Sequence, residues 1–254
     1  MRLYLIILLA SAIIISACSK SKRTTQESLL KITSSGSNAA GRGAVEKLLR
    51  FVGGSARVRS IKTLRLTYGD SESTKAIFSI VYPDRVVAQI STPHGIDLAV
   101  QNPECYWVRD NRLLGVSPNK CVIDNQNLAH NFVNVLQHID SPHYSFFSEG
   151  IRKVGDNPAT VVDVNANGAV TRWWIGEDGR LLQELYFSNE TIGLGTLIYR
   201  YTEWKEVDQL NYPVTYESRD EIREGAPIVS RISKVELNPT VDPTLFIKPD
   251  SKRN

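Results

Sequence analysis

The sequence has few of the residues and motifs on which catalysis depends. It contains only four histidines and three cysteines among 254 residues. No serine stands in a G-x-S-x-G turn, and neither G-x-x-x-x-G-K-[ST] nor G-x-G-x-x-G occurs. His138, Asp140 and His143 are close together, but Pro142 interrupts any helical face that would align them as metal ligands. We therefore expect a protein that is not an enzyme and that holds no metal or cofactor.

The sequence also lacks an excess of charge of either sign. Lys and Arg together number 30, and Asp and Glu number 27, which gives a net charge of +3. Proteins that bind nucleic acid usually present a concentrated basic face. This balance therefore argues against a nucleic-acid partner.

The longest hydrophobic run is short and stands at the N-terminus. It extends from Leu3 to Ile15 after Arg2 and is followed by small residues. A membrane-spanning helix needs about 20 apolar residues, so this pattern is more typical of a signal peptide. The segment Ile15-Ser16-Ala17-Cys18 resembles the lipobox of bacterial lipoproteins, in which the cysteine becomes the acylated first residue. The alternative is an ordinary cleaved signal followed by an incidental cysteine.

We accordingly expect a signal peptide over residues 1–17 and a lipid anchor, including palmitate, on Cys18. Residues 18–42, rich in Ser, Thr, Lys and Gly, are expected to be a flexible tether, and residues 43–254 a single domain. Lys20, Lys22 and Arg23 follow the anchor, where anionic head groups stabilise each basic residue by about 1 kcal/mol.

Two cysteines remain in the predicted domain. Cys105 and Cys121 flank a predicted hairpin over residues 106–114, and an even pair in an oxidising compartment is a candidate disulfide. A disulfide requires Cα atoms within about 7 Å, which the spacing in sequence does not decide. The pairing therefore stays open at this point.

Hydrophobic periodicity predicts one helix followed by an antiparallel β domain. Apolar residues at helical spacing end at Gly53-Gly54, and alternation of period two follows over residues 64–68, 76–82, 86–90 and 96–100. Asp124 is the expected N-cap of a second helix with the apolar stripe Leu128, Phe132, Val135 and Leu136. Strands resume from Phe146 to Leu237, giving about ten or eleven in all. Several strands are apolar on both faces, so something must cover each side of the sheet.

Aromatic residues are frequent in the predicted strands. They form either a packed sheet core or the wall of a cavity for an apolar ligand, and the sequence alone does not separate these two interpretations. The residues concerned are Trp107, Trp173, Trp174, Tyr186, Phe187, Tyr199, Tyr201 and Trp204.

The order of these elements resembles the superfamily of bacterial lipoprotein-localisation factors, which includes a periplasmic carrier and its outer-membrane receptor. The matching segments are the helix ending at Gly53-Gly54 and residues 61–68, 82–86, 106–108, 201–207, 212–213 and 238–249. The resemblance spans essentially the whole predicted domain. It implies an unclosed β-barrel, that is, a strongly curved antiparallel sheet with short helices covering its concave side.

In the best-known members of that superfamily, the concave side holds acyl chains. The resemblance therefore implies a lipid-anchored protein that faces the periplasm, most readily from the outer membrane, and binds or transfers an apolar or acylated ligand such as a lipid or lipoprotein. Other envelope proteins are further candidate partners. The alternative function is an interaction module or accessory subunit with a filled core. Expected cavity residues are Leu64, Leu66, Phe78, Ile80, Leu98, Val100, Leu128, Phe132, Trp173, Leu185, Tyr199 and Tyr201.

Overall fold

The computed structural model describes residues 37–69, 75–92, 95–102, 104–109, 112–115, 118–166, 168–186, 197–220 and 226–249. The predicted signal peptide, the predicted lipidation site Cys18 and most of the predicted tether lie outside these residues. Helix α1 (Ala39–Val52) begins inside the range assigned to the tether, because Asn38 caps it by accepting a hydrogen bond from the Gly41 backbone N–H at 2.7 Å.

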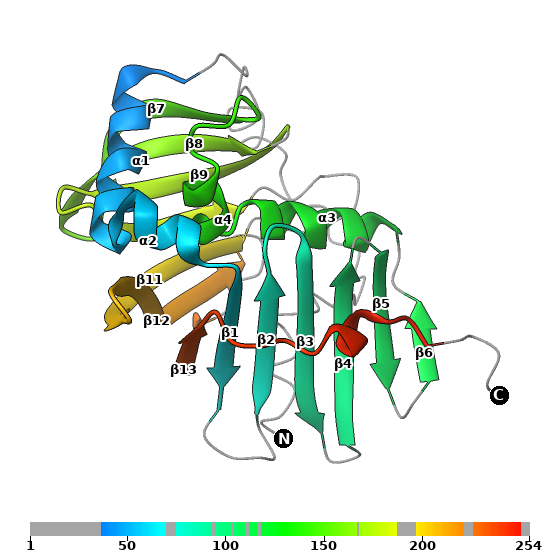
Figure 1. The fold of residues 1–254 in the computed structure, drawn as a ribbon. Helices are drawn as coiled ribbons and strands as arrows, with labels where there is room; N and C mark the ends of the chain where they lie inside the picture. Colours follow the sequence, from blue (N-terminus) through cyan, green and yellow to red (C-terminus); the bar gives the residue numbers. More distant parts are fainter. Residues whose placement is uncertain are drawn as a thin grey trace, which may run out of the picture.

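Within these described residues, the dominant element is one antiparallel sheet of thirteen strands, where ten or eleven were predicted. Its spatial order is β6-β5-β4-β3-β2-β1-β13-β12-β11-β10-β9-β8-β7 (Figure 1). The strands are β1 (Thr63–Tyr68), β2 (Ala76–Val81), β3 (Arg85–Thr92), β4 (Gly95–Asn102), β5 (Glu104–Arg109), β6 (Arg112–Gly115), β7 (Tyr144–Val154), β8 (Asn157–Ala166), β9 (Ala169–Gly176), β10 (Leu181–Tyr186), β11 (Leu197–Val207), β12 (Leu210–Asp220) and β13 (Ile228–Leu237).

The sheet is curved but not closed, as predicted. Its two edge strands, β6 and β7, are consecutive in sequence and are connected by the helices α3 (Pro118–Ala129) and α4 (Phe132–Gln137). The first and last strands, β1 and β13, pair in the middle of the sheet. Asn238 supports this junction, because its side-chain oxygen accepts a hydrogen bond from the Lys62 backbone N–H at 2.7 Å.

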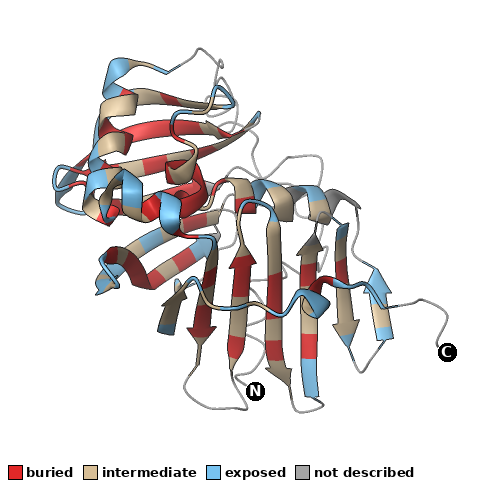
Figure 2. Ribbon diagram, viewed as in Figure 1, coloured by how far each residue is buried: buried red, intermediate tan, exposed pale blue. Residues whose placement is uncertain are grey.

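The concave side is covered by helices, and the main hydrophobic core lies beneath them. Helix α1 buries Val45, Leu48 and Val52 completely, and it ends at Gly53, from which α2 (Gly54–Ser60) continues directly. Figure 2 shows buried positions recurring along the strands and gathered on α4, where every residue from Phe132 to Leu136 is buried. The predicted N-terminal helix and its glycine stop are confirmed.

The predicted second helix differs from the structure in two ways: it begins earlier than predicted, and it is divided into two helices, α3 and α4. Helix α3 starts at Pro118, so Asp124 lies within it and the prediction that Asp124 is the N-cap is wrong. Asn131 then leaves the helical conformation, and its side-chain oxygen accepts a hydrogen bond from the Val133 backbone N–H at 3.1 Å. This local bond starts a second helix, α4.

The convex side of β2–β5 has its own apolar cluster, which the C-terminal segment covers. Val87, Val100 and Tyr106 are buried against Phe246 of the short 3₁₀ helix η5 (Pro243–Phe246). Figure 1 shows this segment crossing the strands on the side away from α3. For strands β2–β5, the prediction that both faces of the sheet are covered is confirmed. Within the described ranges, no helix has the length and apolar character needed to cross a membrane.

Close packing of α1 on β7 generates the first prediction. A Cβ atom at Gly41 would collide with the backbone of Phe146 and lie 2.8 Å from the Ser148 backbone nitrogen, whereas a Cβ at Gly43 would meet nothing within 4 Å. We expect Gly41→Ala to lower the free energy of unfolding by about 1–3 kcal/mol through overpacking. The control Gly43→Ala, in the same helix, should raise it by about 0.5–1 kcal/mol. Urea denaturation of the full chain followed by circular dichroism measures both, and equal stabilities would contradict this packing.

Candidate ligand-binding site

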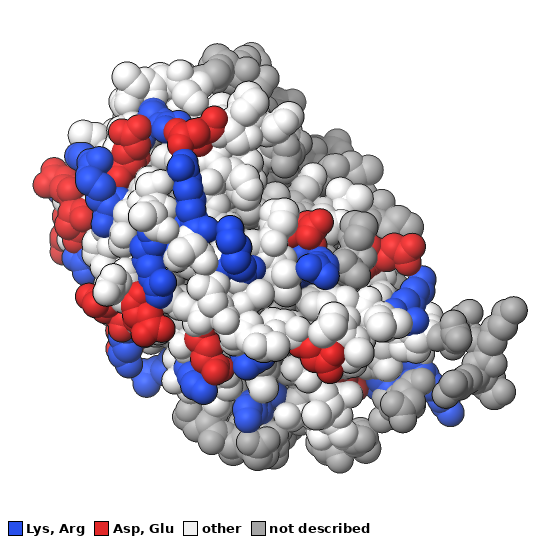
Figure 3. Space-filling view, in the orientation of Figure 1, with Lys and Arg blue, Asp and Glu red and all other residues white. Residues whose placement is uncertain are grey.

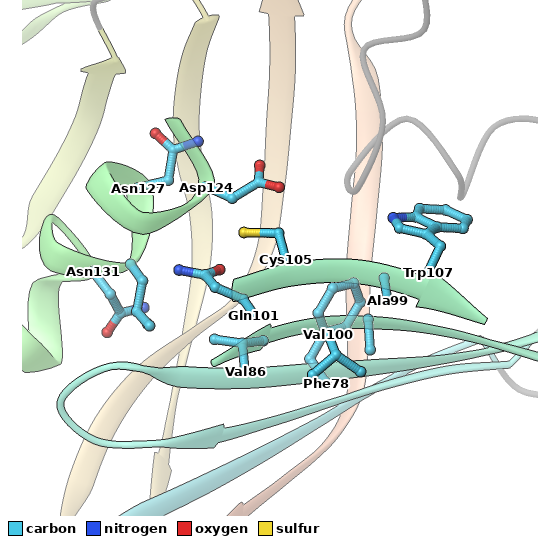
Figure 4. Close-up of a pocket in the computed structure, with 12 residues that line it drawn as sticks. Phe78, Val86, Ala99, Val100, Gln101, Cys105, Trp107, Asp124, Asn127 and Asn131 are labelled. Carbon is cyan, nitrogen blue, oxygen red and sulfur yellow. The ribbon is translucent and has the colours of Figure 1, made fainter. Parts of the chain in front are cut away.

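Two pockets open on the concave side of the sheet, below α3 and the start of α4. We call the first the apolar pocket, a space of about 190 Å³ between α3 and strands β2–β5 (Figure 4). The second, the tyrosine pocket, has a volume of about 220 Å³ and lies toward β10–β13. Asn127 and Asn131 border both pockets. One ligand could therefore reach from one pocket into the other.

A row of four cross-strand neighbours forms the floor of the apolar pocket. Phe78 on β2 stands opposite Ala88 on β3, Ala88 opposite Ala99 on β4, and Ala99 opposite Trp107 on β5. Residues directly opposite each other share a face of the sheet. The two alanines therefore place small side chains between the aromatic side chains of Phe78 and Trp107. The pocket exists because small residues stand in the middle of this row.

The roof of the apolar pocket is α3, which is attached to the sheet by a covalent and a polar contact. Cys105 of β5 and Cys121 of α3 are joined by a disulfide, with Cα atoms 5.4 Å apart. The Gln101 side-chain amide donates a hydrogen bond to the Asn125 side-chain oxygen at 2.7 Å. Leu128 contributes apolar surface from the helix. The disulfide that the sequence left open therefore holds the cover of the pocket in place.

The tyrosine pocket is lined by rings from several strands. Tyr201 and Tyr216 have ring centroids 6.2 Å apart, Tyr199 and Tyr216 5.7 Å apart, and both pairs meet at 65°. The Tyr216 hydroxyl donates to the Tyr68 hydroxyl at 3.2 Å. Burial raises the pKa of Tyr68, Tyr199 and Tyr212 well above the usual value of a tyrosine, so these hydroxyls stay protonated.

A buried carboxylate borders the same pocket. Glu184 of β10 is only 1% exposed. The Trp173 indole N–H donates to its Oε1 at 2.8 Å, and the Tyr201 hydroxyl donates to its Oε2 at 2.6 Å. These two hydrogen bonds fix the orientation of the carboxylate on the concave face. The tyrosine pocket thus combines aromatic walls with an acidic group.

The structure brings most of the predicted cavity residues to the concave side, in two different settings. Phe78, Val100 and Leu128 border the apolar pocket, and Leu66, Phe132, Tyr199 and Tyr201 line the tyrosine pocket. By contrast, Leu64, Ile80 and Trp173 belong to the packed core beneath the helices. The aromatic residues are therefore divided between the packed core and the border of a pocket.

Two predicted cavity residues, Leu98 and Leu185, face away from the pockets, and for these two the prediction is wrong. Leu98 packs against the convex cluster under η5, and the Val100 side chain also belongs to that cluster although the residue borders the apolar pocket. Leu185 follows Glu184 on β10 and therefore points to the opposite face. On β4 the alternating apolar residues, Leu98 and Val100, mark the convex face that the C-terminal segment covers. The sequence interpretation had assigned them to the concave face.

Several site residues were missed by the sequence interpretation. Tyr68 continues the alternation of Leu64 and Leu66, and Tyr212 and Tyr216 are four residues apart on one strand, so period two could have found them. Glu184 carried no such signal, because an isolated glutamate in a strand usually faces solvent. Its burial depends on Trp173 and Tyr201, which lie on other strands.

The histidine-containing segment after α4 serves a structural purpose. Asp140 accepts hydrogen bonds from Arg42 and Arg59, each at 2.5 Å, and the His138 ring stacks on Tyr144 with centroids 5.7 Å apart.

Basic and acidic side chains are intermixed on the face shown in Figure 3. Among the residues that the structure describes, no group of three or more His, Cys, Asp or Glu side chains is placed to hold a metal.

Comparison with known proteins identifies the fold only. No family model matches the sequence, and no curated protein matches it. The crystal structure of a DUF1329 family protein from Desulfovibrio piger is similar over 83% of this chain and 98% of that one, with a TM-score of 0.53 and 10% identity. That of a LolA superfamily protein from Nitrosomonas europaea is similar over 83% and 99%, with a TM-score of 0.49 and 10% identity.

A third similar structure is a domain described as an outer membrane lipoprotein-sorting protein from Vibrio parahaemolyticus. The similarity covers 76% of this chain and 94% of that one, with a TM-score of 0.44 and 10% identity. At these identities the likeness concerns the fold and not the ligand.

Loss of the disulfide should loosen the cover of the apolar pocket. The two cysteines are 16 residues apart, and a loop of that size stabilises a fold by about 3 kcal/mol in the chain-entropy model. We expect the double variant Cys105→Ser/Cys121→Ser to lose roughly that amount. Amide hydrogen exchange should accelerate in α3 more than in α1, which serves as the internal reference. Equal acceleration in both helices would show that the bond does not act locally.

A buried histidine at the end of α3 predicts a pH effect on stability. Burial lowers the pKa of His130, whose ring lies 3.0 Å from the Ala169 carbonyl oxygen. The unfolded chain therefore binds more protons than the folded chain just below about pH 6.5, so stability is present above that pH and lost as pH falls. In urea denaturation between pH 7.5 and 5.5, His130→Gln should lose less stability than the wild type. Identical losses would contradict this assignment.

Proposed function

We propose that the chain is a non-enzymatic, lipid-anchored protein of the cell envelope that binds or hands over an apolar or acylated ligand. One observation carries the proposal, namely the apolar pocket beneath α3, whose floor is the row of Phe78, Ala88, Ala99 and Trp107. Filling it with apolar groups of a ligand would contribute about 0.8 kcal/mol for each CH₂ removed from water. The ligand would occupy the space that side chains larger than those of Ala88 and Ala99 would otherwise fill.

The sizes of the pockets bear on what kind of ligand fits. Typical small-molecule sites are about 300–1,000 Å³, and each pocket here is smaller than that. A ligand would therefore occupy both pockets past Asn127 and Asn131, or leave part of itself outside. An acyl chain suits such a site because it is narrow and flexible.

The location proposed for the protein follows from its N-terminal sequence and its disulfide. The lipobox-like segment ending at Cys18 would anchor the chain to a membrane, and Ser19 lacks the acidic character of inner-membrane retention signals in enteric bacteria. The bond between Cys105 and Cys121 supports an oxidising compartment, which the periplasm provides. We therefore place the domain in the periplasm, most readily on the outer membrane.

The second candidate function is an interaction module that holds no ligand. It is favoured by the packing of Leu64, Ile80 and Trp173, which fill part of the concave side with the chain's own side chains. Such a protein would act through its surface on other lipoproteins or envelope proteins. The two candidates differ in whether the apolar pocket is occupied when the protein is isolated.

Native mass spectrometry of the full chain, released from non-ionic detergent, tests the proposal. We expect an apolar adduct at near-stoichiometric occupancy in the wild type and its loss in Ala99→Leu. The larger side chain would fill space that is already present in the floor of the pocket, so its fold should be kept. Ala56→Leu, on the exposed surface of α2, is the matched control and should retain the adduct. A clean apo mass for the wild type would contradict the proposal and favour the interaction module.

A further inference from the structure

A third pocket lies beside the junction of α3 and α4 and is larger than either pocket described above. Its volume is about 370 Å³, and it is bordered by the β2–β3 turn, the end of β4, the two helices and the segment that leads into β7. This volume is within the usual range of small-molecule sites, about 300–1,000 Å³. Gln101 and Leu128 border both this pocket and the apolar pocket. The third pocket therefore adjoins the proposed ligand site.

One hydrogen-bond acceptor of the third pocket is buried and has no partner. Asn134 of α4 lines the pocket and is 3% exposed. Its side-chain nitrogen donates to the backbone oxygens of Pro83 at 3.4 Å and Leu128 at 3.3 Å, and these oxygens can only accept, so the orientation of the amide is fixed. In the described part of the chain the Asn134 Oδ1 atom has no hydrogen-bond partner. Buried polar atoms are nearly always paired, so this oxygen points to a donor from outside the chain.

Two further acceptors border the same pocket. The His138 Nδ1 atom lies 2.8 Å from the Asn134 backbone oxygen, so Nδ1 carries a proton and the neutral ring keeps Nε2 as an acceptor. The ring stacks on Tyr144 with the two planes 11° apart, which holds it in position. Asp84, in the exposed β2–β3 turn, adds a carboxylate. The pocket thus presents three acceptors to a ligand.

The charges around the third pocket narrow the class of ligand. No Lys or Arg is among the described residues that line it, so it lacks the groups that usually hold a phosphate or carboxylate. Asp84 is exposed to water, which screens its attraction for a cation. The ligand that fits three acceptors without a strong charge is one with several neutral donors. Sugar hydroxyls are donors of this kind, and the half-buried Tyr144 ring offers apolar surface to a sugar ring.

We propose that the third pocket binds an uncharged, hydroxyl-rich ligand, namely a carbohydrate ring, whose hydroxyls donate to Asn134, His138 and Asp84. This assignment concerns the third pocket alone. That the carbohydrate is the head group of a lipid whose chain lies in the apolar pocket rests on the proposed function above. Gln101 and Leu128 border both pockets, so the two parts of such a glycolipid would be neighbours.

Water-soluble sugars test the carbohydrate site independently of any acyl chain. The full chain, in a polyoxyethylene detergent that contains no sugar, is titrated with the methyl α-glycosides of glucose, galactose and mannose. The matched control probe is the tetra-O-methyl derivative of the glucoside, which keeps the ring and its oxygens but has no hydroxyl donor. Saturation-transfer NMR of the probe follows binding. We expect at least one glycoside to bind about tenfold or more tightly than the control probe.

An amino sugar separates a hydroxyl site from a cation site. The methyl glycoside of glucosamine carries an ammonium group where the glucoside carries one hydroxyl. Binding no tighter than that of the preferred glycoside supports the proposal, whereas tighter binding assigns the pocket to a cation and overturns it. No binding of any glycoside, or equal binding of the O-methylated probe, also overturns it and leaves the Asn134 oxygen to an ordered water molecule.

Two substitutions assign the binding to the third pocket. Asp84→Asn keeps the size of an exposed side chain and removes the carboxylate, and His138→Phe keeps a ring against Tyr144 and removes Nε2. Each should weaken binding of the preferred glycoside by about fivefold or more. The control Asp156→Asn, in the exposed β7–β8 turn, should leave the affinity unchanged. Circular dichroism verifies folding, and Asp84→Asn alone decides if His138→Phe does not fold. Unchanged affinity in the folded pocket variants overturns the proposal.

The failure of this inference can be told from the failure of the proposed function. A chain that carries an apolar adduct in mass spectrometry but binds no glycoside retains the proposed function and lacks the carbohydrate site. A chain that binds a glycoside but carries no adduct has the carbohydrate site and is not an acyl-chain binder. The two measurements depend on different pockets.

Discussion

The structure depends on one constraint, which is that its central strands are apolar on both faces and each face must be kept from water. The concave face is covered by α1, α2 and α4, and the convex face of β2–β5 by the C-terminal segment around Phe246. A single helix layer would leave one face exposed. This requirement explains why, in the described part of the chain, helices α1 and α2 precede the sheet, the segment after β13 crosses back over it, and α3 and α4 connect its two edge strands.

The candidate site lies where this covering is incomplete. In the main core the concave face is filled by large side chains such as Trp173, whereas under α3 the row of neighbours contains Ala88 and Ala99. The disulfide to Cys121 keeps α3 above that space. The cover and the low floor together produce a pocket, because neither the helix nor the strands can close the gap alone.

Much of the fold could be predicted from the sequence because it rests on local periodicity. The helix ending at Gly53, the alternating strands and the need to cover both faces are all visible in residue order. The face of β4 could not be assigned in this way, since Leu98 and Val100 look like core residues whichever layer covers them. Glu184 was also beyond prediction, because its partners Trp173 and Tyr201 come together only in the folded sheet.

Photo-crosslinking tests most directly whether the concave side holds an apolar ligand. The full chain in membranes that contain a diazirine-labelled fatty acid is irradiated, digested and mapped by mass spectrometry. Our account predicts labelled peptides from α3 and strands β2–β5, including the one that carries Ala99. Labelling that is confined to the N-terminal segment, or to the convex peptides around Phe246, would contradict it.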